Sequence, residues 1–260
     1  MTDWTGLSTA IAAAERAGCT LGVAATAPNG SRFAHNGDRR FVAASTVKIA
    51  IMIELFRRID AGTDALDQRH VLREDDKSTG GGVVKELHAG IEFTVADLVY
   101  LMMAISDNST TNILIDRVGQ AEVNATMQRL GMKGSTLGRK MRGRPVLDTE
   151  QENWSVPNEY ADLIAAIFAN QAASPASCAA MVALLEKQAN DRRIARHLPK
   201  ADRPRWGTKT GSLTGVVNDV GFIMTPSGPL FLAIFCEIAD PHAGEAVVGD
   251  VARAALAAAG

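Results

Sequence analysis

Apolar residues recur at helical spacing through the middle of the chain, whereas apolar runs of strand length occur near both ends. The first segment, 3–17, has helical spacing and stops at Gly18, a residue typical of a helix C-cap. An alanine-rich stretch over about 243–259 predicts a second terminal helix. The predicted strands are 20–27, 32–35, 205–209, 216–225 and 229–237.

The segment from about Ser45 to Leu185 is predicted to be almost entirely helical. Two tight turns, Pro28-Asn29-Gly30-Ser31 and Pro226-Ser227-Gly228, join strands that must therefore run antiparallel. We expect both hairpins to lie in one sheet. The predicted helices of the middle segment are 47–59, 95–105, 110–118, 121–130, 157–170 and 178–188.

These elements predict an α+β fold with two lobes. An antiparallel sheet flanked by the terminal helices is expected to form one lobe, from residues 1–44 and 190–260. An all-helical lobe, residues 45–189, is inserted between the strands. Ligand sites are common in clefts of this kind, so we expect the functional site between the lobes.

Composition excludes several classes of protein. The chain has 260 residues, 47% hydrophobic and 22% charged, with a formal net charge of −2. This balance excludes global disorder and argues against a nucleic-acid partner, which selects for a basic excess. The three cysteines form no CxxC and the five histidines have no ligand spacing, so we expect no metal and no cofactor.

The sequence carries no pattern typical of a membrane protein or of an exported one. The longest apolar run, 98–105, is too short to span a bilayer, so we expect no membrane partner. The first residues, 1–4, do not resemble a signal peptide. We therefore expect a cytoplasmic monomer, or a periplasmic or secreted protein if a leader has been removed.

A serine and a lysine three residues apart open the most apolar predicted helix. Ser45 and Lys48 share a helix face at this spacing, and 49–56 is apolar nearly all round, as in a buried helix. Burial disfavours a charged lysine, so a neutral Lys48 amine can take the Ser45 hydroxyl proton. A serine N-cap followed by an unrelated lysine accounts for the same residues.

Two further polar segments lie next to predicted elements. Ser106-Asp107-Asn108 follows an apolar helix end and can relay a proton or simply N-cap the next helix. Lys209-Thr210-Gly211-Ser212 lies among the C-terminal strands. Its cation and hydroxyls suit a substrate carboxylate, and its backbone N–H groups suit an oxyanion. An ordinary exposed edge strand explains the same residues.

The order of the three segments is more specific than any one of them. Ser-x-x-Lys, Ser-Asp-Asn and Lys-Thr-Gly follow one another roughly 60 and 100 residues apart. Over about residues 3–258 the chain resembles the class A β-lactamase and penicillin-binding-protein superfamily of serine hydrolases, where these motifs occur as a set. The resemblance implies a small-molecule substrate with a carboxylate and an acyl amide or ester, opened through an acyl-serine.

The resemblance also implies roles for individual residues. Ser45 is expected to be the acylated nucleophile, Lys48 its proton acceptor and Ser106 the shuttle to the leaving nitrogen. Asn108 is expected to bind an amide of the substrate, and Asp107 to orient its own loop. The residues implied to anchor the carboxylate or complete the oxyanion hole are Lys209, Thr210, Ser212 and, as an arginine that some members place before the last motif, Arg196.

The chain departs from the class A pattern after the second motif. Class A enzymes carry a glutamate some three dozen residues further on, which activates the water for deacylation. Here no Asp or Glu occurs over 123–147, and the stretch 135–145 is basic. Acidic residues occur again over 148–152. Either an acid of this run, such as Glu152, reaches the site and replaces the missing glutamate, or the whole run is exposed to solvent.

The missing glutamate leaves three functions open. The first is opening of a β-lactam through acyl-Ser45 with slow deacylation. The second is an amidase, esterase or peptidase that acts on another acyl compound in the cytoplasm. The third is a β-lactam-binding protein without turnover. The resemblance also places the tract Gly80-Gly81-Gly82 at the cleft wall, where it is expected to be either a plain flexible loop or a mobile wall that widens access.

Overall fold

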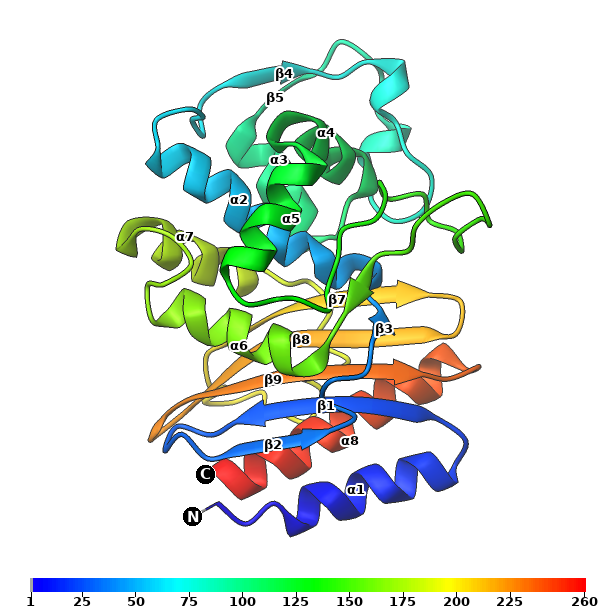
Figure 1. Ribbon diagram of the computed structural model, residues 1–260, viewed down its shortest axis with the longest axis vertical. Coiled ribbons are helices and arrows are strands. Elements are labelled where there is room, and N and C mark those ends of the chain that lie inside the picture. Colours follow the sequence, from blue (N-terminus) through cyan, green and yellow to red (C-terminus); the bar gives the residue numbers. More distant parts are fainter. Residues whose placement is uncertain (1) are drawn as a thin grey trace.

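The computed structural model describes residues 2–260 and confirms the α+β fold (Figure 1). The helices are α1 (Thr5–Arg16), α2 (Lys48–Asp60), α3 (Val95–Ala104), α4 (Asn108–Val118), α5 (Gln120–Arg129), α6 (Pro157–Phe168), α7 (Pro175–Leu185) and α8 (Pro241–Ala259). The strands are β1 (Thr20–Thr26), β2 (Arg32–His35), β3 (Phe41–Val42), β4 (Arg69–Val71), β5 (Glu92–Thr94), β6 (Trp154–Ser155), β7 (Trp206–Leu213), β8 (Val216–Thr225) and β9 (Gly228–Glu237).

The main sheet has five antiparallel strands in the order β2-β1-β9-β8-β7. The first hairpin closes where the Gly30 N–H donates to the Ala27 carbonyl (2.9 Å), and Gly30 adopts φ +80°, which favours glycine. β7 lies at one edge of the sheet. Because side chains alternate along a strand, Thr210 and Ser212 face one side of the sheet and Lys209 the other.

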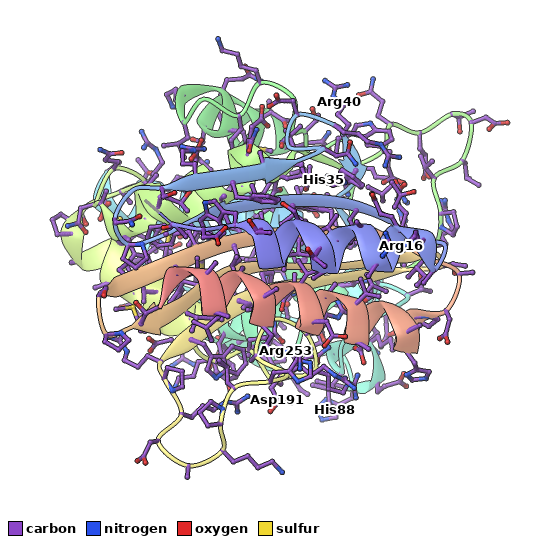
Figure 2. The ribbon with its side chains drawn as sticks, turned by 90° about the horizontal axis from the view of Figure 1, so that it is seen from below. Arg16, His35, Arg40, His88, Asp191 and Arg253 are labelled. Atoms are coloured by element: carbon purple, nitrogen blue, oxygen red, sulfur yellow. The ribbon has the colours of Figure 1, made fainter. Side chains whose placement is uncertain are left out.

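Two helices cover one face of the sheet. Figure 2, seen from below, shows α1 in blue and α8 in red lying side by side across the strands. Their apolar sides bury Leu7 and Ile11 of α1 and Val248 of α8 against strand residues such as Val217 and Ile234. This face receives the side chains of Thr210 and Ser212, since Val217 lies opposite Ser212 in the register.

The other face of the sheet shares a core with the helical region. α6 packs on β9 and β1, and Phe235 of β9 contacts the rings of Phe41 (5.9 Å between centroids) and Tyr160 (5.8 Å). α2 runs through the centre of the helical region, with every residue over 48–56 buried. One continuous cluster therefore joins the sheet to α2 and its neighbours.

The structure differs from the predicted elements in three places. The middle segment also contains short strands: β4 pairs with β5, and β6 pairs with β3. Strands of two or three residues leave no detectable periodicity. β7 continues through Gly211 to Leu213, four residues beyond the predicted end, and α7 begins at Pro175 after its Ser174 N-cap rather than at Cys178. The lobe boundaries remain a prediction.

Candidate active site

Ser45 lies in a tight turn that leads directly into α2. The turn is a 3₁₀ helix, Ala44–Val47, and Ala44 holds a φ of +47°, a strained value for a residue with a side chain. Its neighbours are buried, whereas Ser45 is partly exposed. A Cβ atom at Gly211 would lie 2.8 Å from the Ala43 carbonyl and 3.2 Å from the Ser45 nitrogen. The glycine of the third motif therefore lets β7 approach the backbone of this turn.

Lys48 joins the first motif to the second. Its ammonium, on a side chain with no exposed surface, donates to the Ser106 carbonyl (2.8 Å), the Ser106 hydroxyl (3.1 Å) and the Asn108 amide oxygen (3.0 Å). Ser106 adopts a φ of +61°, which turns both of its oxygens toward Lys48. Lys48 of the first motif is thus in direct contact with two predicted residues of the second.

The surroundings of Lys48 favour its neutral form. Burial lowers the pKa of Lys48 well below its ordinary value, the charge of Lys209 lowers it further, and Asp107 opposes both effects. A lysine of this kind can act as a general base at neutral pH. Within residues 2–260 the Ser45 hydroxyl makes no hydrogen bond, and catalytic hydrogen bonds commonly tighten only when substrate is bound.

Asp107 organises the wall of the site. It is the N-cap of α4, and Oδ1 accepts from the Thr110 N–H (3.0 Å), while Oδ2 accepts from the N–H groups of Val83 (2.7 Å) and Val84 (2.9 Å). A Cβ atom at Gly82 would lie 2.2 Å from this carboxylate. The glycine tract is therefore packed against the second motif, which corrects its description as a plain flexible loop.

The third motif presents its groups along the edge strand. Lys209 is fully buried and donates to the Thr210 carbonyl (2.9 Å). Burial lowers the pKa of Lys209 to about 7, against the effect of Asp219. Ser212 is exposed. An arginine absent from the prediction, Arg193, donates to the Ser212 hydroxyl (2.6 Å) and the Gly211 carbonyl (2.9 Å).

Arg196 does not reach this group, contrary to the prediction. It is exposed, its side chain lies against Gly249 of α8, and it donates to the Arg192 carbonyl at 3.4 Å. The residue three positions earlier, Arg193, is buried and takes the position next to the third motif. The basic run 192–196 indicated an arginine near the third motif. Because the run lies in no predicted helix or strand, the sequence did not indicate which of its arginines is buried.

A cavity of about 250 Å³ brings the predicted residues together. Beside it lies a recess of about 30 Å³, which has room for about one water molecule. Ser45 borders both spaces, and the recess is bounded on its other side by residues 139–144, Glu152 and Asn153. The cavity is lined by Ser45, Gly81, Ser106, Asn108, Thr210 and Ser212.

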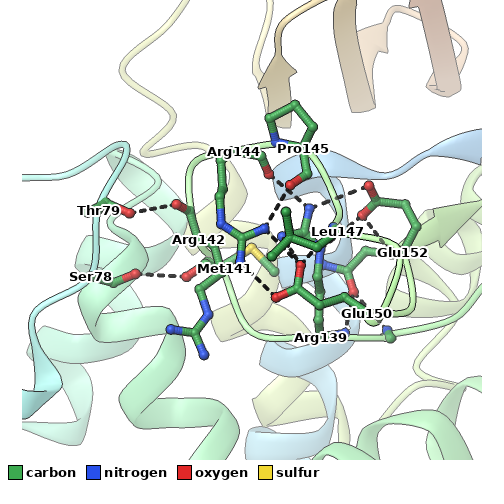
Figure 3. A network of polar contacts seen from close by, with 12 residues as sticks. Ser78, Thr79, Arg139, Met141, Arg142, Arg144, Pro145, Leu147, Glu150 and Glu152 are labelled. Carbon is green, nitrogen blue, oxygen red and sulfur yellow. Dashed lines mark hydrogen bonds and ion pairs between the residues drawn. The ribbon is translucent and has the colours of Figure 1, made fainter.

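Two of the three acids of the 148–152 run are held by arginines, whereas the third, Asp148, is exposed. Figure 3 shows Arg144 directed at Glu150 (2.8 Å) and Arg139 at Glu152 (3.4 Å). Glu152 borders the recess but also accepts from the Asn153 N–H (2.8 Å). These ion pairs correct the interpretation of the run as solvated for Glu150 and Glu152, whereas Asp148 is exposed as expected. Met141, some three dozen residues after the second motif, occupies the part of the loop where class A enzymes are expected to carry glutamate.

Two loops, residues 78–80 and residues 141–143, contact each other beside the recess. We call this contact the clasp. Figure 3 shows the Ser78 hydroxyl donating to the Met141 carbonyl (2.7 Å) and the Thr79 hydroxyl to the Arg142 carbonyl (2.6 Å). Gly80 and Gly143 approach so closely that a Cβ atom on Gly143 would lie 2.4 Å from the Gly80 Cα.

Neither a metal site nor a membrane span is present in the part of the chain that the structure describes. No group of three or more His, Cys, Asp or Glu side chains over 2–260 could hold a metal ion. None of the described helices is both long enough and apolar enough to cross a bilayer.

A buried lysine beside a reactive serine and a second serine defines an acyl-serine hydrolase. Residues 6–259 match the family described as "Beta-lactamase enzyme family". The chain belongs to this family, within the class A β-lactamase and penicillin-binding-protein superfamily, and is a β-lactamase-type serine hydrolase.

Solved structures agree in fold over nearly the whole chain. A β-lactamase from Sphaerobacter thermophilus is 56% identical, with a TM-score of 0.97 over 99% of this chain and 98% of that one. An ancestral class A β-lactamase is 30% identical, with a TM-score of 0.88 over 97% and 99%. A point mutant of PBP-A, solved as an acyl-enzyme complex with penicillin G, is 25% identical, with a TM-score of 0.85 over 96% and 94%.

Proposed function

We propose that the enzyme opens the amide bond of a β-lactam through an acyl-Ser45 intermediate and releases the product slowly. The observation that carries the proposal is the recess beside Ser45. It has room for about one water molecule, yet the carboxylate on its border, Glu152, is already bound by Arg139. A base for acylation is in place, whereas a free carboxylate for deacylation is not.

Acylation follows from the contacts of Lys48. The Ser45 oxygen attacks the amide carbon as its proton passes to the neutral Lys48 amine. The carbon–nitrogen bond then breaks, and the leaving nitrogen takes a proton from the Ser106 hydroxyl, which Lys48 re-protonates across 3.1 Å. Backbone N–H groups of Ser45 and Ser212 stabilise the oxyanion in this scheme.

The substrate is expected to carry a carboxylate near the amide. Lys209, Thr210 and Ser212 lie together on the edge strand, and Arg193 adds a permanent charge next to the Ser212 hydroxyl. Pairing with such donors gives charge-assisted hydrogen bonds, which are the strong ones. The PBP-A mutant supports the assignment by likeness, because that protein forms an acyl-enzyme with penicillin G.

Intact-mass spectrometry after mixing with penicillin G tests the proposal. We expect the mass of one substrate molecule to be added to the wild type, to persist for minutes, and to be missing in Ser45→Ala. Ser227→Ala, at the exposed turn between β8 and β9, is the matched control and should react like the wild type.

Other outcomes distinguish the rival functions. Fast nitrocefin turnover with no adduct would contradict slow release. Hydrolysis of p-nitrophenyl esters alone would indicate an esterase or amidase for another acyl compound. A stoichiometric burst with no later turnover would indicate a β-lactam-binding protein.

A further inference from the structure

Asp219 is a buried carboxylate with too few partners. It lies on β8 directly opposite Thr210 and is 1% exposed. Oδ2 accepts from the Ile194 N–H (3.1 Å), whereas Oδ1 makes no hydrogen bond of standard geometry within the described chain, although the buried Thr208 hydroxyl on β7 lies near enough to lower the pKa of the carboxyl. A buried charged oxygen without a partner is costly, so a role other than packing is expected for it.

Two cations act on Asp219: Arg193 from the segment before β7, and Lys209 from β7. Arg193 also pairs with a second acid, Glu245 of α8, at 3.5 Å from Nε. Burial raises the pKa of Asp219 to about 6, and the charge of Arg193 opposes this most strongly. Asp219 in turn supports the charged form of Lys209. The carboxylate thus compensates two buried cations, Lys209 of the third motif and Arg193 beside that motif.

Asp219 also fixes the position of Arg193. The Ile194 N–H that it binds belongs to the next residue along the chain. From that anchored point the Arg193 guanidinium spans the strands, donating to the Asn218 carbonyl on β8 (2.7 Å) and to the Ser212 hydroxyl on β7 (2.6 Å). Loss of the Asp219 charge would therefore affect the arginine that binds Ser212, a residue of the cavity lining.

We propose that Asp219 is a positioning residue for the carboxylate-binding part of the site, acting through Arg193 and Lys209. The proposal rests on the function proposed above. It predicts that Asp219 matters for substrates with a free carboxylate and hardly at all for the same substrates with that carboxylate masked. A purely structural role would affect both kinds of substrate alike.

The experiment compares penicillin G with its methyl ester. The second-order rate of Ser45 acylation is measured by intact mass from pH 5 to pH 9 for the wild type and Asp219→Asn. The amide oxygen of the variant can still accept from Ile194. We expect the rate with penicillin G to fall about tenfold at neutral pH, equivalent to about 1.4 kcal/mol. The rate with the methyl ester should change less than about twofold.

The pH profile gives a second readout. Removing a negative charge lowers the pKa of Lys209 further, so Lys209 loses its charge at a lower pH in Asp219→Asn. The alkaline fall in the penicillin G rate should therefore move to lower pH. Asp250→Asn, an exposed acid on α8, is the matched control and should leave both the rates and the profile unchanged.

Arg193→Gln keeps the proposal testable if Asp219→Asn does not fold. This variant should show the same selective loss, and Asp219→Asn added to it should lower the rate little further. Equal losses for both substrates, or no loss, would overturn the inference alone. A wild-type chain that penicillin G does not acylate would refute the proposed function as well, so the two failures are distinguishable.

Discussion

Lys48 and Lys209 are both fully buried, yet their surroundings assign them different tasks. Lys48 faces neutral oxygens of Ser106 and Asn108, so burial leaves it as a base. Lys209 has Asp219 nearby, which offsets part of the burial and keeps its charge available around pH 7. Asp107 acts on Lys48 in the same sense, but there burial and the charge of Lys209 outweigh it, so the two lysines suit proton transfer and carboxylate binding respectively.

Met141 lies in the part of the loop where the resemblance to class A enzymes leads us to expect a glutamate. Its side chain is buried at the recess beside Ser45. The Asn112 amide holds its backbone at both ends, donating to the Met141 carbonyl (2.9 Å) and accepting from the Met141 N–H (2.8 Å). A substitution here changes the side chain at a fixed backbone position.

We expect Met141→Glu to speed release of the acyl group. A carboxylate at the recess can act as a general base for the water, which contributes about 10²–10⁴-fold in known enzymes. The measurement is the decay of the penicillin G adduct by intact mass. Met141→Gln, of similar size but not basic, is the control. Equal decay in both variants would show that polarity or space, rather than a base, limits the step.

The site could be predicted only as far as its residues follow motifs. Ser45, Lys48 and Ser106 belong to spaced segments; in the structure Lys48 donates to the Ser106 hydroxyl, and Ser45 and Ser106 line one cavity. Arg193 and Asp219 were not predictable, because their contacts depend on how the irregular segment before β7 packs against β7 and β8. Nothing local in the sequence distinguishes Arg193 from Arg196.

At the scale of elements, the clasp connects the loop over the recess to the catalytic lysine. Gly143 contacts Gly80, and a Cβ atom on Gly143 would also lie 3.0 Å from the Thr79 carbonyl. That carbonyl accepts from the Asn108 amide (2.9 Å), whose oxygen accepts from Lys48. Displacement of the clasp should therefore reach Lys48 through two hydrogen bonds.

Gly143→Ala tests this connection against a matched glycine. Gly143 (φ +63°) and Gly131 (φ +83°) share a left-handed backbone, but nothing lies within 4 Å of a Cβ atom at Gly131. Both alanine variants should lose about 1 kcal/mol of unfolding free energy from backbone strain. We expect Gly143→Ala alone to slow acylation, by about tenfold, equivalent to about 1.4 kcal/mol.

Thermal unfolding and the penicillin G acylation rate measure the two effects. If Gly131→Ala slows acylation as much as Gly143→Ala, the connection through Thr79 and Asn108 is refuted. The sequence indicated a glycine tract at the cleft wall but not its partner loop. The two loops lie some 60 residues apart in the chain, and their contact depends on the placement of α4 between them.

At the scale of the whole molecule, the active site depends on a core that the sheet and the helical region share. The terminal strands and central helices were predictable from periodicity. The pairing of β1 with β9, which joins the two hairpins into one sheet, was not. Phe235 of β9 has no exposed surface and contacts rings from β3 and α6. Its cluster also contains most of α2, the helix that begins at Lys48.

Because one core joins both regions, Phe235→Ala should destabilise them together. We expect a loss of about 3–5 kcal/mol of unfolding free energy, the usual cost of such a cavity. Amide hydrogen exchange should show equal losses of protection in α2 and β1. Phe33→Ala, on the partly exposed strand β2 against Trp4, is the control and should cost less. Loss of protection in β1 alone would show that the helical region unfolds independently and holds Lys48 without the sheet.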